Sequence, residues 1–131
     1  MTTKATADWL ETAIVADLGV TCKKGFPAFD QPAIATGAYI EWASTSPQYG
    51  ERVSSSLDRW EVQITLVVVT ANEIALWSMI DLMEAMSESR TEATISSKRT
   101  RIRFAPIERA ENPNGLSALR YVAQTIIQFV R

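Results

Sequence analysis

Histidine is absent from the 131-residue sequence, and cysteine occurs only once, at Cys22. Without histidine the chain cannot build a Ser-His-Asp or Cys-His catalytic site, or a histidine-ligated zinc site. A single cysteine cannot form an intrachain disulfide, which is typical of proteins kept in a reducing compartment. The core alone is therefore expected to hold the fold, and several widespread kinds of catalytic site are excluded.

Long apolar runs and a strong excess of one charge are also lacking. No run approaches the roughly 20 apolar residues of a bilayer-spanning helix, and the first residues lead into an amphipathic stretch rather than a signal peptide. The net charge is only -2, which disfavours a protein whose whole surface follows nucleic acid. We expect a protein made in a cytoplasm, with no membrane partner.

The composition that remains is that of one ordinary globular domain. Hydrophobic residues make up 47% of the chain and charged residues 21%, and a chain of this length buries roughly two-thirds of its unfolded surface. No phosphate-binding glycine loop, metal-spaced cluster or nucleophile elbow is present. We therefore expect a single domain over residues 1–131 that is not an enzyme and needs no cofactor or metal.

The first helical pattern covers Ala5 to Leu18. Leu10, Ile14 and Leu18 recur at four-residue steps, with Ala7 and Val15 expected beside them. Gly19 is placed to end the helix in a left-handed conformation.

The second helical pattern follows Thr70-Ala71-Asn72-Glu73, which matches a capping box with Thr70 as the N-cap. It extends to about Glu88, with Asp81, Glu84 and Glu88 toward solvent. One stripe holds Leu76, Met79, Ile80, Met83 and Met86, with Trp77 at its edge. We interpret the methionines as core filler rather than a cofactor site, and the carboxylates as a solvated face.

Strand patterns occupy much of the remaining sequence. Ala33 to Ala43 alternates, Leu57 to Thr70 is the clearest strand and is expected in the middle of the sheet, and Leu116 to Arg131 is apolar on both faces. Thr91 to Ser96 and Thr100 to Ile107 are predicted to form a hairpin around Ser97-Lys98-Arg99. The fold class is therefore α+β, an antiparallel or mixed sheet with two helices on one face plus a hairpin.

Two segments are predicted as loops. Cys22 to Pro32 is rich in glycine and proline, and Ser44 to Ser56 has little apolar surface. A long polar loop within a domain either orders on a partner or has no role, and both interpretations remain open. In the first, Tyr49, Glu51 and Arg52 are candidate interface residues.

Two helices cover only one face of a sheet whose strands are apolar on both. The second face either binds a partner or is covered by the folded-over hairpin. Lys98, Arg99, Arg101 and Arg103 form a basic strip, with the three arginines on one strand face. The strip is interpreted as a solvated strand edge, as an interface with acidic neighbours, or, least favoured because no aromatics interleave, as a nucleic-acid contact.

The order of these elements resembles the tail-terminator proteins of long-tailed bacteriophages. The matching features are the helix ending at Gly19, Phe26-Pro27-Ala28-Phe29, Leu57-Asp58-Arg59-Trp60-Glu61-Val62 after a polar loop, the Asn72 to Glu88 helix and the hydrophobic closing strand. The resemblance covers the whole chain and rests on length and element order rather than on a sharp motif.

The resemblance implies a structural virion protein at the junction of tail and neck. Such a protein forms a ring, expected to have six subunits, that caps the tail tube, ends its polymerisation and presents the head attachment surface. The implied partners are copies of itself, the tail tube protein and a head-completion or neck protein, with the tail sheath as a further candidate. DNA is expected only as the passing genome. A head-completion or neck ring subunit is the first alternative, and a small-molecule-binding or catalytic α+β domain is the second.

Overall fold

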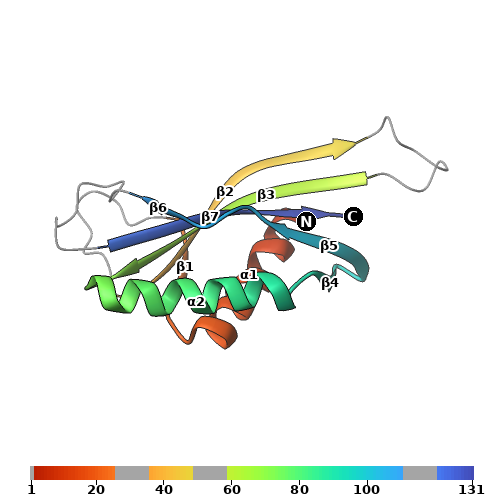
Figure 1. Cartoon of the computed structure of the whole chain (residues 1–131). Coiled ribbons are helices and arrows are strands. Elements are labelled where there is room, and N and C mark those ends of the chain that lie inside the picture. Colours follow the sequence, from red (N-terminus) through yellow and green to blue (C-terminus); the bar gives the residue numbers. More distant parts are fainter. Residues whose placement is uncertain (1, 26–35, 49–58, 111–120) are drawn as a thin grey trace.

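A computed structural model describes residues 2–25, 36–48, 59–110 and 121–131 (Figure 1). In these residues the chain forms two helices and seven strands. In chain order they are α1 (Thr2–Leu18), β1 (Cys22–Lys24), β2 (Gly37–Gln48), β3 (Arg59–Thr70), α2 (Glu73–Ser89), β4 (Glu92–Ile95), β5 (Lys98–Phe104), β6 (Glu108–Ala110) and β7 (Tyr121–Val130).

All described strands belong to one mixed sheet, in the order β1-β2-β3-β7-β5-β4, with β6 pairing β7 beside β5. Only β1 and β2 are parallel, and the other pairs are antiparallel. The strand β3 pairs along its whole length with β2 on one side and with β7 on the other. The predicted central position of this strand and the predicted α+β class are confirmed.

Both helices lie against the same face of the sheet (Figure 1). The core between the layers joins Leu10 and Ile14 of α1, Met83 of α2, and the inward side chains of β3 and β7 such as Leu66 and Ile127. These inward residues alternate with outward ones because the side-chain period of a strand is two. The predicted two-layer arrangement is confirmed.

The helix α1 ends where the glycine pattern predicted. Gly19 adopts φ +66°, and its amide donates to the carbonyl of Val15 at 3.1 Å. The expected burial of Val15 is wrong, because this side chain is 51% exposed while Thr6 and Ala13 are buried. Val15 lies about 100° further round the helix than Ile14, past the edge of the apolar stripe.

The start of α2 differs from the predicted capping box. Asn72, in an extended conformation, is the N-cap, and its side-chain oxygen accepts from the amide of Ala75 at 2.8 Å. Thr70 is the last residue of β3, paired with Tyr121, and its hydroxyl donates to the carbonyl of Asn72. The backbone of Thr70 is held in the sheet, so the helix begins two residues later than expected. Its stripe of Leu76, Met79, Met83 and Met86 is buried as predicted.

The strand β2 is longer at its C-terminal end than the alternation predicted. Ser44–Gln48, expected in a loop, continue the pairing with β3 after an irregularity between Trp42 and Ser44. Residues 49–58 lie outside the described part of the chain, as do 33–35. The extension exists because β3 supplies backbone partners to a segment whose own side chains have little apolar surface.

Two short strands were not predicted. Cys22–Lys24, assigned to a loop, pair in parallel with residues 38–40 of β2, and Gly25 ends this strand with φ +79°. Glu108–Ala110 form β6 along β7. Three-residue strands carry too little alternation to be recognised, and only the neighbouring edge determines them.

The predicted hairpin is confirmed as β4 and β5, with a shift in its turn. Ser96 and Ser97 form the turn with φ +53° and +63°, the pattern of a type I′ connection, so Lys98 and Arg99 already belong to β5. The hairpin does not fold over the outer face, because β5 pairs with β7 and extends the sheet. Among the described elements, no helix covers that face (Figure 1).

Candidate partner-binding surface

The outer side of β5 carries a row of three arginines. Arg99, Arg101 and Arg103 are exposed, while Thr100 and Ile102, between them, are buried on the helix side. This alternation follows from the strand period. The predicted shared face of the three arginines is confirmed, and we call these residues the arginine row.

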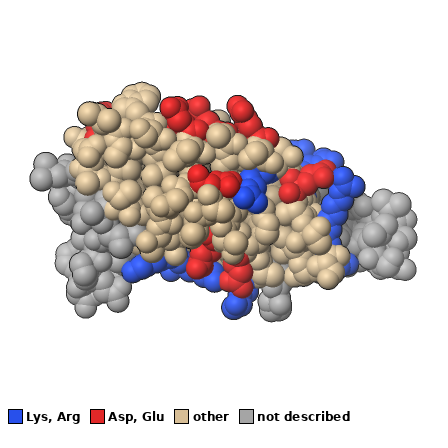
Figure 2. Space-filling model, turned by 90° about the horizontal axis from the view of Figure 1, so that it is seen from below, with Lys and Arg blue, Asp and Glu red and all other residues tan. Residues whose placement is uncertain are grey.

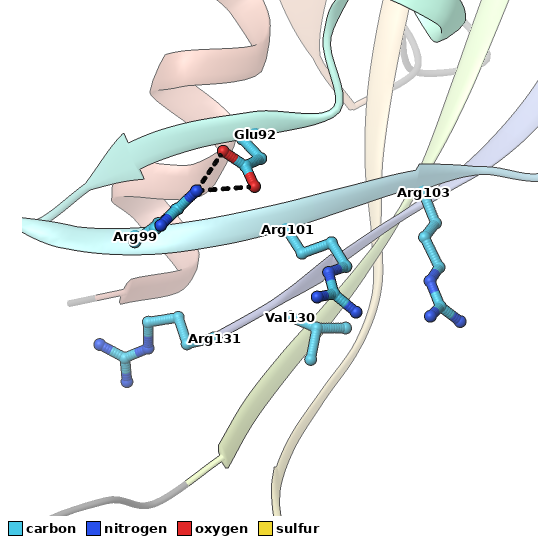
Figure 3. A pocket seen from close by; sticks show the side chains of 6 residues that line it. All are labelled: Glu92, Arg99, Arg101, Arg103, Val130 and Arg131. Carbon is cyan, nitrogen blue, oxygen red and sulfur yellow. Dashed lines mark hydrogen bonds and ion pairs between the residues drawn. The ribbon is translucent and has the colours of Figure 1, made fainter.

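The arginine row borders an open depression of about 510 Å³ (Figure 3). Pairing of β5 with β7 places Val130 directly beside Arg101, which brings the next residue, Arg131, to the same place. The lining consists of Glu92, Arg99, Arg101, Arg103, Val130 and Arg131. Four guanidinium groups therefore surround one surface hollow, with a single carboxylate in its lining.

Only one arginine of the row has an ion-pair partner among the described residues. Arg99 donates from Nη2 to both oxygens of Glu92, at 3.1 and 2.9 Å (Figure 3). Neither Arg101 nor Arg103 makes a salt bridge or side-chain hydrogen bond within the described chain. The depression therefore has an excess of positive charge, which suits a partner with carboxylates or phosphates.

Arg131 is held differently from the row. Its guanidinium carbon lies 5.7 Å from the ring centre of Trp60, and its backbone amide donates to the carbonyl of Trp60 at 2.9 Å. Within the described residues, Nε of Arg131 and Nε1 of Trp60 are buried without a hydrogen-bond partner. Stacking on the indole fixes the arginine at the margin of the depression while leaving its charge uncompensated.

A carboxylate next to this hollow is already engaged by amides. Glu61 accepts hydrogen bonds from Nε2 of Gln63 at 3.1 Å and from Nε2 of Gln128 at 2.6 Å. Glu61 of β3 pairs with Val130 of β7, which in turn pairs with Arg101 of β5. Only the strand β7 therefore separates Glu61 from Arg101. The outer face thus has a polar end next to the arginines.

Further along, the same outer face becomes apolar. Tyr39, Val67, Val69 and Val122 form a second buried cluster there. Between the two ends lies Ile126, which is 46% exposed. Ile126 lies on the neighbouring strand β7, two residues from Gln128, which pairs with Arg103. It therefore lies beyond the end of the arginine row, further along the same face of the sheet.

The solvent side of α2 is a second notable surface. Ile74 and Trp77 are 82% and 63% exposed, and Asp81, Glu84 and Glu88 follow on the same side of the helix. Among the described residues, no salt bridge engages these carboxylates. Seen from the helix side, acidic side chains lie on the upper margin and across the middle, and basic ones at the right-hand end and along the lower margin (Figure 2).

The candidate interface residues predicted from the sequence do not all lie at this depression. Arg99, Arg101 and Arg103 come together, whereas Lys98 is exposed on the other side of β5, beside Ile95, and does not line the depression. Tyr49, Glu51 and Arg52 lie outside the described residues. Sequence reasoning missed Glu92 and Arg131, since only the pairing of β4 and β7 with β5 brings them to the row.

Cys22 is the single thiol of the sequence. Burial raises the pKa of the Cys22 thiol to about 12, with a smaller contribution from the charge of Glu11. At neutral pH this cysteine is a buried thiol rather than a thiolate nucleophile. No group of three or more Cys, Asp or Glu side chains in the described residues is placed to hold a metal ion. No described helix is long and apolar enough to cross a membrane.

Comparison with known proteins gives similarity in structure only. No protein-family model matches the sequence, and a search of curated proteins finds no relative. A chain in the virion of a native gene transfer agent particle is similar with a TM-score of 0.52 and 12% identity, over 89% of this chain and 82% of that one. A second solved chain, without a functional name, matches with a TM-score of 0.55 and 12% identity, over 97% and 87% of the two chains. At these identities the comparison shows a shared fold.

Proposed function

We propose that this chain is a structural, non-enzymatic subunit of a phage-type virion and that it acts as a tail terminator. In this role, copies of the chain form a ring, expected to be hexameric, at the junction of tail and neck. The ring caps the tail tube, stops its polymerisation and presents a surface to the head-completion or neck protein. The proposed location is the assembled virion, reached from the host cytoplasm.

One observation carries the proposal: the fold over most of this chain is similar to that of a chain in a gene transfer agent virion, most of which is covered in turn. The predicted order of helix, two strands, helix and three strands is present in the structure, with β1 and β6 in addition. The surface supports the same role, since Arg101 and Arg103 have no ion-pair partner among the described residues and Ile74 and Trp77 are exposed. Aromatic and arginine side chains are among the groups enriched at protein contacts.

The first test is the assembly state of the purified chain. Light scattering over a concentration series, with electron microscopy of the same sample, is expected to show a closed ring. Added tail tubes are expected to bind the ring at their ends, and to stop growing there. A chain that remains monomeric and leaves tube ends free would contradict the proposal.

The same experiment separates the terminator from a neck subunit. A head-completion or neck ring protein is expected to bind the portal side and to ignore isolated tubes. Binding to portal complexes, with no binding to tubes, would therefore replace the terminator assignment by the neck assignment while keeping the structural role.

A further inference from the structure

Two surfaces of this subunit are complementary to each other and lie on opposite sides of the molecule. One is the arginine row with Ile126 on the outer face of the sheet, and the other is the solvent side of α2, beyond the helix layer. A surface that meets a different surface of an identical copy generates a closed ring or an open filament. We infer that the arginine row of one copy binds the solvent side of α2 of the next copy.

The two surfaces carry opposite charges. Arg101 and Arg103 have no acidic partner in the described part of the chain, and Glu84 and Glu88 have no basic one. An arginine fork binds a carboxylate through two parallel hydrogen bonds, and it is favoured at contacts because it is weakly hydrated. Each copy therefore presents unpaired cations on one side and unpaired anions on the other.

The spacing of the charges also matches. Two residues along a strand advance by about 6.7 Å, which separates Arg101 from Arg103. Four residues along a helix advance by about 6 Å, which separates Glu84 from Glu88. The long arginine side chains can absorb a difference of this size. The two pairs can thus form together in one orientation of the helix along the strand.

The apolar groups follow in the same order on both surfaces. On α2, Trp77 and Ile74 come after the carboxylates in the direction of the N-terminus, and both are well exposed. On the sheet, Ile126 comes after Arg103 in the line of the row. When the charges pair, Ile126, about 6.7 Å beyond Arg103, lies between Asp81 and Trp77 of the next copy, which are about 4.5 and 10.5 Å beyond Glu84. This arrangement places an apolar contact beside the ion pairs, as at typical interfaces.

The inference rests on the proposed ring, and it identifies the two surfaces through which neighbouring copies bind. Charge reversal tests it in the full chain. The first variant, Arg101→Glu with Arg103→Glu, and the second, Glu84→Lys with Glu88→Lys, each place like charges against each other. We expect each variant alone to need at least ~100-fold higher concentration for assembly than the unaltered chain. Circular dichroism and urea unfolding establish that both variants are folded.

The decisive sample is an equal mixture of the two variants. The acidic sheet face of the first then meets the basic helix of the second, and the unaltered arginine row of the second meets the unaltered helix of the first. We expect an alternating ring with an even number of subunits in the mixture, although neither variant forms one alone. The matched control for the first variant, Lys23→Glu with Lys98→Glu, makes the same change in net charge at exposed sites outside both surfaces and is expected to assemble normally.

Three other outcomes would contradict the inference, the proposed function or both. Rings from either variant alone, as readily as from the unaltered chain, would overturn the inference and leave the proposed function intact. Folded variants that fail both alone and mixed would show that the two surfaces contribute to assembly without meeting each other, and would overturn the inference. An unaltered chain that forms no ring, with or without tail tubes, would overturn the proposed function and the inference together.

Discussion

Cys22 shows how burial decides the chemistry of a single side chain. The thiol is buried between α1 and the sheet, and its pKa is raised to about 12. Because the thiolate is the reactive species, a lone cysteine in this position is expected to be inert.

The first prediction concerns the reactivity of this thiol. At pH 8 the folded chain is expected to react with an aromatic disulfide reagent at least ~100-fold more slowly than the chain unfolded in urea. The reaction is followed by absorbance. As a control, the variant Cys22→Ala with Ala71→Cys, which places the thiol at an exposed site, is expected to react quickly when folded. Rapid labelling of the native Cys22 would contradict its burial.

A second residue-scale prediction concerns Asp17 and Arg90. Arg90 donates from Nε and Nη2 to the two carboxylate oxygens of Asp17, both at 2.9 Å, and so links the ends of α1 and α2. These hydrogen bonds lower the pKa of Asp17 below its usual value of 3.8. The stabilisation is therefore complete above about pH 4 and is lost as the pH falls through the lowered pKa of the folded chain.

Asp17→Asn is expected to cost about 1 kcal/mol in the free energy of unfolding at pH 7, since the pair is partly exposed. The gap between this variant and the unaltered chain should narrow toward zero in urea titrations carried from pH 7 down to pH 2. Asp81→Asn, at an exposed carboxylate without a described partner, serves as the control. A gap that is independent of pH would argue against the ion pair.

Among the elements, α2 shows how a neighbouring strand decides where a helix begins. The capping-box pattern placed the N-cap at Thr70, but that residue is held in the sheet by its pairing with Tyr121. Asn72 caps the helix instead, and Glu73 forms an ion pair with Arg109. Both residues can cap a helix in principle, and sheet pairing selects between them.

Asn72→Ala is expected to lower the free energy of unfolding by about 1 kcal/mol, because the amide of Ala75 loses its side-chain acceptor. Urea unfolding followed by circular dichroism measures the loss. Asn72→Asp should retain the stability, since it keeps the acceptor and adds a negative charge at the helix N-terminus. A change at the exposed neighbour, Ala71→Ser, should stay within about 0.5 kcal/mol. An unaffected Asn72→Ala variant would point back to Thr70 as the cap.

At the scale of the whole molecule, one face of the sheet forms the core and the other is proposed to form a contact with another copy. Ile127 faces the helices and is fully buried, while Ile126, the preceding residue, is 46% exposed on the outer face. The first belongs to the core that holds helices and sheet together. The second belongs to the surface proposed to meet another copy.

Ile127→Ala is therefore expected to destabilise the monomer by about 2–5 kcal/mol, because it leaves a cavity in the core. Ile126→Ala should cost less than about 1 kcal/mol, since half of its side chain is already exposed. Urea unfolding of both variants at low protein concentration, where assembly does not contribute, provides the comparison. Equal losses would show that the outer face is packed as tightly as the inner one.

The sequence alone determined the features that follow from local periodicity and backbone chemistry. The four-residue spacing in α1, the stripe of α2 and the alternation in β3 predicted which faces are buried. Gly19 predicted the end of a helix. The α+β class and the shared face of Arg99, Arg101 and Arg103 followed from the same patterns, because periods of 3.6 and 2 are properties of the chain itself.

Only the tertiary structure decided the features that depend on a partner strand. The extension of β2 through Ser44–Gln48, the short strands β1 and β6, and the choice of Asn72 as the cap all require a neighbouring backbone. The arginine hollow is of the same kind, because Arg131 and Glu92 join the row only through the register of β7 and β4 with β5. Register is set by contacts between segments distant in the sequence, so local patterns cannot specify it.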